Sequence, residues 1–244
     1  MDSKVKIAFC IFTYGDDAWM VGQCVRALRK LGANRSNVFI FDDAYEPLPY
    51  PIPNTQYRQT TFKRNGNLNG NESVDGQLLS MLEASKESNA HLVIKVDSDT
   101  IINNLDWVLN EDFMNSHIGF KICNKSHLCG GAYSLPTWAL IPMLRRLSHY
   151  PYEPDKGESI FMTELAKEVG LSQIGYDCST IKQGEIWRCS SLLDKSLTKD
   201  GKLESHAYGV MKNLDVVLCD LIADKRDKQR NYLLMKNYLD LSEF

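Results

Sequence analysis

Apolar runs and segments with helical periodicity alternate along the first half of the chain. Three apolar runs have the composition of strands buried on both faces: residues 5–15, 37–45 and 91–102. Residues 57–62 form a shorter candidate strand. Helices are predicted over residues 16–31, where Asp16 or Asp17 can cap the first turn, and over residues 72–86. Strands that alternate with helices in this way predict a parallel, doubly wound α/β sheet.

The second half of the chain is less regular. Its patterns predict helices at about 136–149 and 158–169, short strands between 172 and 189, and a charged helix from about residue 221. The sequence contains no internal repeat and no clear linker. We therefore predict a single domain over residues 1–244, with a first lobe at 1–102, a second lobe at 103–210 and a C-terminal helical extension at 211–244.

Composition narrows the classes of function. The chain has 244 residues, of which 43% are apolar and 24% are charged, as in ordinary soluble globular proteins. A net charge of -3 gives no broadly basic surface, so no nucleic-acid partner is expected. No run is long enough for a signal peptide or a transmembrane segment, and a cytoplasmic protein is expected. The seven cysteines include no C-x-x-C pair, which argues against a disulfide framework or a structural zinc site.

Two aspartates, Asp97 and Asp99, interrupt the apolar run "HLVIKVDSDTII". A carboxylate is costly to bury without a cation or strong hydrogen-bond donors, so such a group is expected beside them. Ligands of doubly wound sheets bind beyond the carboxyl ends of the strands, and residues 13–17, 42–43 and 64–71 fall at the same edge. Carboxylates at this spacing suit a hard divalent cation that also binds a diphosphate. The alternative is a turn in which either aspartate caps backbone N–H groups.

The order of five short motifs resembles that of GT-A glycosyltransferases, which use nucleotide-diphosphate sugars. "VIKVDSDTII" resembles the metal-binding D-x-D strand of these enzymes. "IAFCIFTYGDD" resembles their first strand and donor loop, and "VFIFDDAYEP" resembles their second strand, which ends in acid. "KRNGNLNGNES" and "HLCGGAYSLPTWAL" are similar to the segment before the D-x-D strand and to the acceptor-side glycine motif. The resemblance spans roughly residues 5–210 and implies a GT-A-like, Rossmann-type, doubly wound mixed sheet with helices on both faces.

The resemblance implies a metal-dependent, hexosyltransferase-like enzyme. It would move a sugar from a nucleotide-diphosphate donor, expected to be a UDP-sugar, to a carbohydrate or other hydroxyl acceptor. The implied metal is Mn²⁺ or Mg²⁺, bound by Asp99, by Asp97 directly or through water, and by His206. The implied donor-binding residues are Thr13, Tyr14, Asp42, Asp43, Arg64 and Asp97. The plainer alternatives are packing for Tyr14, turn capping for Asp42 or Asp43, and an ordinary surface or core position for Arg64 and His206.

On the acceptor side, the resemblance implies Gly130 and Gly131 of the glycine motif and a general base at the start of a helix. GT-A enzymes keep that base in a Glu-Asp pair, whereas this chain has Glu158 followed by Ser159. Glu158 is therefore the expected catalytic base, and a helix N-terminus would favour its ionised form. The alternative is that Glu158 only stabilises the first turn of its helix. The departure from the pair leaves inversion or retention of configuration open.

Three other functions share parts of this pattern. A haloacid-dehalogenase-type phosphatase is rejected, because its motif needs threonine two places after the second aspartate and Thr100 follows Asp99 directly. A sugar-phosphate nucleotidyltransferase would carry a glycine-rich, basic loop after the first strand, unlike "TYGDDAW". A non-catalytic carbohydrate- or nucleotide-binding module of the same fold stays open. Tyr133, Trp138 and Trp187 can stack on sugars in a module or an enzyme, and core packing is the favoured alternative for Trp138.

The C-terminal stretch "ADKRDKQRNYLLMKNYLDL" mixes basic residues with leucines. The expected structure is an amphipathic helix that docks on its own domain. The alternative is a peripheral contact with a membrane surface or with a second copy of the chain.

Overall fold

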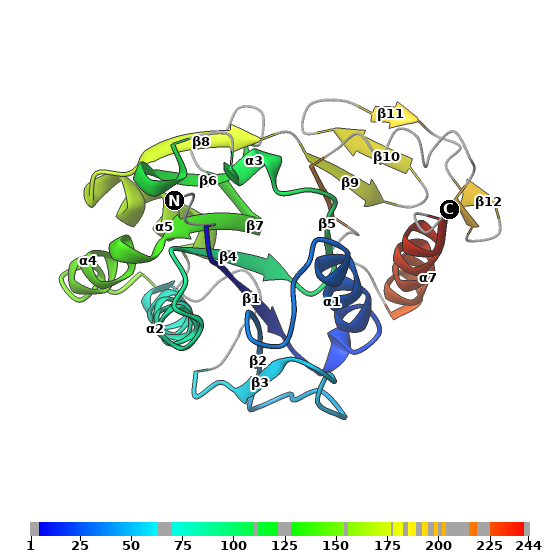
Figure 1. The fold of residues 1–244 in the computed structure, drawn as a ribbon, viewed down its shortest axis with the longest axis horizontal. Coiled ribbons are helices and arrows are strands. Elements are labelled where there is room, and N and C mark those ends of the chain that lie inside the picture. Colours follow the sequence, from blue (N-terminus) through cyan, green and yellow to red (C-terminus); the bar gives the residue numbers. More distant parts are fainter. Residues whose placement is uncertain are drawn as a thin grey trace.

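The computed structural model describes most of the chain. The described residues are 5–62, 70–109, 112–121, 128–153, 156–176, 178–182, 185–188, 192–194, 198–199, 202–203, 215–218 and 225–241. They form a large mixed β-sheet with helices on both faces and a smaller sheet next to it (Figure 1).

The larger sheet joins seven of the described strands in the order β3-β2-β1-β4-β7-β6-β8. In chain order these strands are β1 (Ile7–Thr13), β2 (Val38–Asp42), β3 (Gln56–Gln59), β4 (Leu92–Asp97), β6 (Ser116–Lys121), β7 (Leu128–Pro136) and β8 (Ser172–Tyr176). β1 pairs in parallel with β2 and β4, and β2 pairs in parallel with β3. β7 runs antiparallel to β4 and β6, so β6 and β8 point the same way as β4. This arrangement confirms the predicted mixed α/β fold.

Helices cover both faces of the larger sheet. The described helices and 3-10 turns are η1 (Gly15–Asp17), α1 (Val21–Lys30), α2 (Gly70–Ser88), α3 (Asp106–Leu109), η2 (Phe113–Asn115), α4 (Thr137–Leu147), α5 (Glu158–Glu168) and α7 (Lys225–Leu241). Buried side chains of α1 and α7 join a hydrophobic cluster with Phe9 and Ile11 of β1. Those of α2, α4 and α5 join a second cluster with Ala8 and Cys10. Alternate residues of β1 thus face opposite clusters, as expected for a strand buried on both faces.

The smaller sheet joins five of the described strands in the order β11-β10-β9-β14-β5, and β12 pairs with β13. These strands are β5 (Thr100–Ile102), β9 (Cys178–Lys182), β10 (Glu185–Arg188), β11 (Leu192–Asp194), β12 (Thr198–Lys199), β13 (Lys202–Leu203) and β14 (Val216–Leu218). The two sheets are connected by the chain that leaves β4 and enters β5 (Figure 1).

Residues 91–102 do not form the single strand that the apolar run predicted. β4 ends at Asp97 in the larger sheet, and β5 begins at Thr100 in the smaller sheet, where it pairs antiparallel with β14. Ser98 and Asp99 make the turn between them. Both halves of the run are apolar, so the pattern of side chains could not reveal a change of sheet. The two aspartates therefore lie at the junction of the two sheets.

The first helix begins later than predicted. Residues 15–17 form η1, and α1 starts at Val21 without a side-chain cap from Met20. The buried carboxylate of Asp17 is engaged elsewhere, because it accepts a hydrogen bond from the hydroxyl of Ser98. Asp17 thus ties the loop after β1 to the turn after β4.

The C-terminal helix α7 packs on its own domain, as expected. Arg26 of α1 donates a hydrogen bond to Asp240 Oδ1 at 2.5 Å, and Lys30 Nζ donates to the carbonyl of Leu239 at 2.5 Å. Leu234 and Tyr238 are buried in the same hydrophobic cluster as α1. Within the ranges that the structure describes, no helix is long and apolar enough to cross a membrane.

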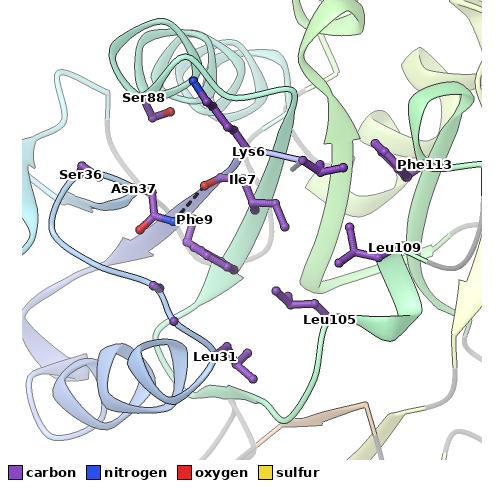
Figure 2. A pocket seen from close by; sticks show the side chains of 13 residues that line it. Lys6, Ile7, Phe9, Leu31, Ser36, Asn37, Ser88, Leu105, Leu109 and Phe113 are labelled. Carbon is purple, nitrogen blue, oxygen red and sulfur yellow. Dashed lines mark hydrogen bonds between the residues drawn. The ribbon is translucent and has the colours of Figure 1, made fainter. Parts of the chain in front are cut away.

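A cavity of about 670 Å³ opens at the start of β1 (Figure 2). Its mostly apolar walls include Ile7 and Phe9 of β1 and Leu105 and Leu109 around α3. Ile7 begins β1, whereas Phe12, near the other end of this strand, is in register with Asp97. The cavity therefore lies beyond the amino-terminal end of β1, whereas the two aspartates lie at the carboxyl-terminal ends of the parallel strands.

Candidate functional site

A buried lysine accompanies the D-x-D aspartates. Lys95 and Asp97 project from the same face of β4, because side chains two residues apart on a strand point the same way. Lys95 Nζ lies 2.6 Å from Asp97 Oδ1, and the two side chains are only 3% and 11% exposed. Lys95 is thus the cation that burial of these carboxylates led us to expect.

The same lysine lies near the first residue of α5. Lys95 Nζ is 3.6 Å from Glu158 Oε1, and the hydroxyl of Tyr133 is 3.5 Å from that carboxylate oxygen. Burial raises the pKa of Tyr133 well above its usual range, and the charges of Glu158 and Asp97 raise it further. The phenol therefore stays protonated and can donate to Glu158. We call Lys95, Asp97, Tyr133 and Glu158 the lysine cluster.

The register of the larger sheet explains how these residues meet. Lys95 of β4 is paired with Tyr133 of β7, so the two side chains stand next to each other on one face. The Lys95 ammonium lies 5.7 Å from the centre of the Tyr133 ring. α5 covers the same face, since Phe161 packs in one hydrophobic cluster with Tyr133. The start of α5 is thereby brought to the end of β4.

The turn that contains Asp99 is held from the α1 side. Asp99 is only 3% exposed, and the neighbouring Ser98 donates to Asp17 in the loop after β1. Cys24 of α1 lies 3.7 Å, sulfur to oxygen, from the carbonyl of Asp97. Burial raises the pKa of the Cys24 thiol, and the charges of Asp99 and Asp97 raise it further, so the thiol stays neutral. The turn between β4 and β5 is therefore held in place by contacts with the loop after β1 and with α1.

The loops after β1 and β2 are joined to each other. The backbone N–H of Asp43 donates to the carbonyl of Thr13 at 3.0 Å, and that of Gly15 donates to the carbonyl of Glu46 at 2.6 Å. A Cβ at Gly15 would lie 3.0 Å from the carbonyl oxygen of Pro47, so glycine allows this close approach. Within the described part of the chain, Thr13 Oγ1 is a buried hydroxyl without a hydrogen-bond partner. The hydroxyl of Thr13 thus lies next to a loop that backbone hydrogen bonds hold in place.

Asp42 shapes the loop after β2. Its Oδ2 accepts hydrogen bonds from the backbone N–H of Leu48, at 2.8 Å, and from the hydroxyl of Tyr57. Burial raises the pKa of Asp42, and these hydrogen bonds oppose the rise. Asp43 Oδ1 accepts a hydrogen bond from the backbone N–H of Tyr45 at 2.8 Å. This is the turn capping that was considered as the alternative to donor binding. The donor-binding roles of both aspartates stay predictions.

The predicted site residues fall into two groups. Those at the carboxyl ends of β1, β2 and β4 and at the facing parts of β7 and α5 gather at one edge: Thr13, Tyr14, Asp42, Asp43, Asp97, Asp99, Gly130, Gly131 and Glu158. The hydroxyl of Thr100 donates to the carbonyl of Gly131 at 3.3 Å, which links the glycine motif to the start of β5. Arg64 and His206 lie outside the described residues, and their roles stay predictions.

The donor atoms at this edge suit a hard divalent cation. Asp97 and Asp99 supply carboxylate oxygens on either side of Ser98, and oxygen is the ligand atom that Mn²⁺ and Mg²⁺ prefer. Lys95 holds one oxygen of Asp97 in place. Among the residues placed by the structure, no three His, Cys, Asp or Glu side chains form a complete metal-binding group. The expected third ligand, His206, lies outside that part of the chain.

The three aromatic candidates have different environments. Tyr133 is 2% exposed and belongs to the lysine cluster. The core-packing prediction for Trp138 was wrong, because its side chain is 45% exposed and its indole N–H donates to the carbonyl of Met114 at 2.7 Å. The indole N–H has a hydrogen-bond partner, but the ring is not part of the core. The side chain of Trp187 lies outside the described part of the chain.

Sequence reasoning did not single out Lys95 or Ser98, and it considered Asp17 only as a helix cap and as part of the loop after the first strand. The signal for Lys95 was a charged residue inside an otherwise apolar run, two places before Asp97 and so on the same strand face. No comparable signal joins Asp17 to Ser98, because that contact depends on how the loop after β1 folds back on the turn after β4.

Two solved glycosyltransferases share this fold. The bifunctional glycosyltransferase WbbM matches 98% of this chain with a TM-score of 0.52 and 11% identity, and the match spans 52% of WbbM. A glycosyltransferase involved in the glycosylation of the major capsid of PBCV-1 matches 92% of this chain, and 98% of its own, with a TM-score of 0.52 and 10% identity. This chain therefore spans about half the length of WbbM. No protein-family model matches the sequence, and a search of curated proteins finds no match. The likeness supports a glycosyltransferase-like, GT-A-type fold.

Proposed function

We propose that this protein is a metal-dependent glycosyltransferase that moves a sugar from a nucleotide-diphosphate donor, a UDP-sugar by preference, to a hydroxyl acceptor. The observation that carries the proposal is the lysine cluster. It brings the first aspartate of the D-x-D turn and the acid that begins α5 to one buried ammonium, at 2.6 and 3.6 Å. A donor-side carboxylate and an acceptor-side base at one sheet edge are the two parts that such a transfer needs.

The donor would lie over the carboxyl ends of β1, β2 and β4. Thr13 has a buried hydroxyl there that can take a hydrogen bond, and Tyr14 follows it beside the loop anchored by Gly15. Asp97, Asp99 and His206 would hold Mn²⁺ or Mg²⁺. When bound, the cation would neutralise charge on the departing diphosphate.

Glu158 would act on the acceptor. Its carboxylate would take the proton from the acceptor hydroxyl while that oxygen forms a bond to the anomeric carbon and the bond from this carbon to the diphosphate breaks. Tyr133, as a protonated donor, and Lys95, as a cation, lie 3.5 and 3.6 Å from Glu158 Oε1 and would hold this carboxylate beside the acceptor. The N-terminus of α5 adds positive potential at the same point.

Nucleotide release tests the proposal. The protein is incubated with Mn²⁺ and UDP-glucose, UDP-galactose, UDP-N-acetylglucosamine or GDP-mannose, with and without a panel of p-nitrophenyl glycosides as acceptors. We expect one donor to release nucleotide faster when an acceptor is present, and EDTA to stop the release. Tight donor binding without release would instead favour a binding module of the same fold. A transfer of the nucleotidyl group from these donors, which would release a sugar 1-phosphate instead of the nucleoside diphosphate, would contradict glycosyl transfer.

A further inference from the structure

Lys95 occupies a place that a core residue of this sheet would otherwise fill. It is 2% exposed, and its neighbours in register are Cys10 of β1 and Tyr133 of β7, both buried. A buried ammonium loses most of its hydration and must regain that free energy from close negative groups. In the described part of the chain, Asp97 and Glu158 are the carboxylates within 4 Å of its nitrogen.

Stability alone does not explain this arrangement. Replacing a buried ion pair by apolar residues of similar volume is often neutral or stabilising, so a Lys–Asp pair in a core needs a further reason. Here both partners are residues that the proposed reaction uses. Asp97 precedes the turn at the donor edge, and Glu158 begins the helix on the acceptor side.

The two distances differ in a way that indicates two kinds of contact. The 2.6 Å contact with Asp97 is a charge-assisted hydrogen bond that fixes the direction of that carboxylate. The 3.6 Å separation from Glu158 is an ion pair without a hydrogen bond, and Tyr133 supplies a second polar group to the same oxygen at 3.5 Å. Lys95 thus holds Asp97 tightly and attracts Glu158 more weakly.

We propose that Lys95 is a positioning residue for both halves of the site: it orients Asp97 for the donor and keeps Glu158 in place for the acceptor. This inference rests on the proposed glycosyl transfer. Groups that orient ligands or catalytic side chains in this way typically change affinity or activity by roughly 10–100-fold when they are removed. Two separable effects follow, one on donor binding through Asp97 and one on the transfer step through Glu158.

A double-mutant cycle separates these two effects. The variants are Lys95→Met, Glu158→Gln and the double variant, with wild type as the fourth member. Isothermal titration with UDP and Mn²⁺ measures the dissociation constant for the nucleotide. Turnover with the most active nucleotide sugar and acceptor from the panel, both saturating, gives kcat for transfer.

We expect Lys95→Met to weaken UDP–Mn²⁺ binding roughly tenfold or more in both backgrounds, because this effect passes through Asp97. We expect it to lower kcat roughly tenfold in the wild-type background and by less than about threefold in the Glu158→Gln background, because the second effect passes through Glu158. Lys86→Met, which removes an exposed lysine of α2, is the matched control and should change neither quantity.

A purely structural role gives a different result. Partial unfolding would lower kcat without changing the dissociation constant of the folded fraction, and the losses of Lys95→Met and Glu158→Gln would multiply. If the wild-type protein transfers sugar, either outcome overturns this inference but leaves the proposed function standing. Absence of transfer by wild type overturns the proposed function and this inference with it. If Lys95→Met does not fold, Lys95→Gln, which is neutral but keeps an N–H donor for Asp97, goes through the same cycle and is judged by the kcat criterion, which depends on the charge beside Glu158.

Discussion

Glu158 Oε1 and Lys95 Nζ lie 3.6 Å apart, one at the first residue of α5 and the other inside β4. The strand and the helix are joined by this contact at the edge where the D-x-D turn leaves the sheet. A helix-starting acid that only stabilised its own first turn would have no reason to face a buried lysine. The contact therefore favours the catalytic interpretation of Glu158 over the plainer one.

Glu158→Gln should cut sugar transfer by roughly 10²-fold or more, the scale of a lost general base. The substitution is nearly isosteric, so folding and UDP–Mn²⁺ binding should stay close to wild type. Slow hydrolysis of the donor should persist, because departure of the diphosphate does not depend on this carboxylate. Steady-state transfer and hydrolysis rates, measured on the same samples, check the expectation.

Glu164→Gln is the matched control for this variant. Glu164 lies on the same helix, where it contacts Lys156 at 2.7 Å rather than Lys95, and its loss should leave transfer unchanged. Wild-type transfer by Glu158→Gln would return Glu158 to a helix-stabilising role. Retention of configuration at the anomeric carbon of the product would also remove the need for this base.

Much of the fold could be predicted from the apolar pattern. β1, β2 and β4 are apolar runs buried on both faces, and the helices that follow or precede them carry clear periodicity. β6 and β7 gave no such signal. β7 contains Gly130 and Gly131, which weaken strand propensity, and its antiparallel place between β4 and β6 is decided by tertiary pairing.

Asp42→Ala should lower the free energy of unfolding by roughly 2–5 kcal/mol. The variant leaves the backbone N–H of the buried Leu48 and the hydroxyl of the half-buried Tyr57 without their acceptor, and each orphaned donor costs about 1–3 kcal/mol. Urea denaturation followed by circular dichroism measures the change. Asp112→Ala, at an exposed position, is the control and should stay within about 1 kcal/mol of wild type. Equal stability of Asp42→Ala and wild type would mean that the loop after β2 does not depend on this carboxylate.

His117 should make the protein less stable in acid. The side chain is 1% exposed in β6, its Nδ1 lies 2.9 Å from Gln173 Oε1, and burial lowers its pKa from 6.5 to about 4. Between these two values the unfolded chain binds a proton that the native protein does not. This contribution to stability is therefore complete above pH 6.5 and is lost as the pH falls toward about 4.

His117→Gln removes this titration and provides the comparison. Unfolding in urea at pH 7, 5.5 and 4.5 gives the stability of both proteins. We expect the advantage of wild type over the variant to shrink on acidification, by at most about 1.4 kcal/mol per pH unit. A difference that is the same at all three pH values would show that His117 is not the group responsible.

The candidate site could be predicted only in part. Acids at the end of an apolar run or at the start of a helix can be recognised from the sequence alone, which is why Asp97, Asp99 and Glu158 were predicted. Lys95 was visible as a charge in the same run, but its contact with Glu158 depends on how α5 packs on β7. The bond between Ser98 and Asp17 likewise depends on a loop conformation that no local pattern encodes.

The metal-dependent binding of a nucleotide diphosphate is the most direct test of the proposed donor site. Isothermal titration of wild type and Asp99→Ala with UDP, with and without Mn²⁺, measures it without any knowledge of the sugar or the acceptor. Asp99 lies in the turn between two sheets and should coordinate the cation rather than hold the packing, so the variant should fold normally. Asp106→Ala, which removes an exposed acid at the start of α3, is the control and should bind as wild type does. We expect wild type to bind UDP tightly only with Mn²⁺. We expect Asp99→Ala to lose at least about 100-fold in affinity, which exceeds the usual cost of losing a group that only supports a ligand. Binding of UDP with Mn²⁺ to Asp99→Ala as tightly as to wild type would contradict the proposed metal site.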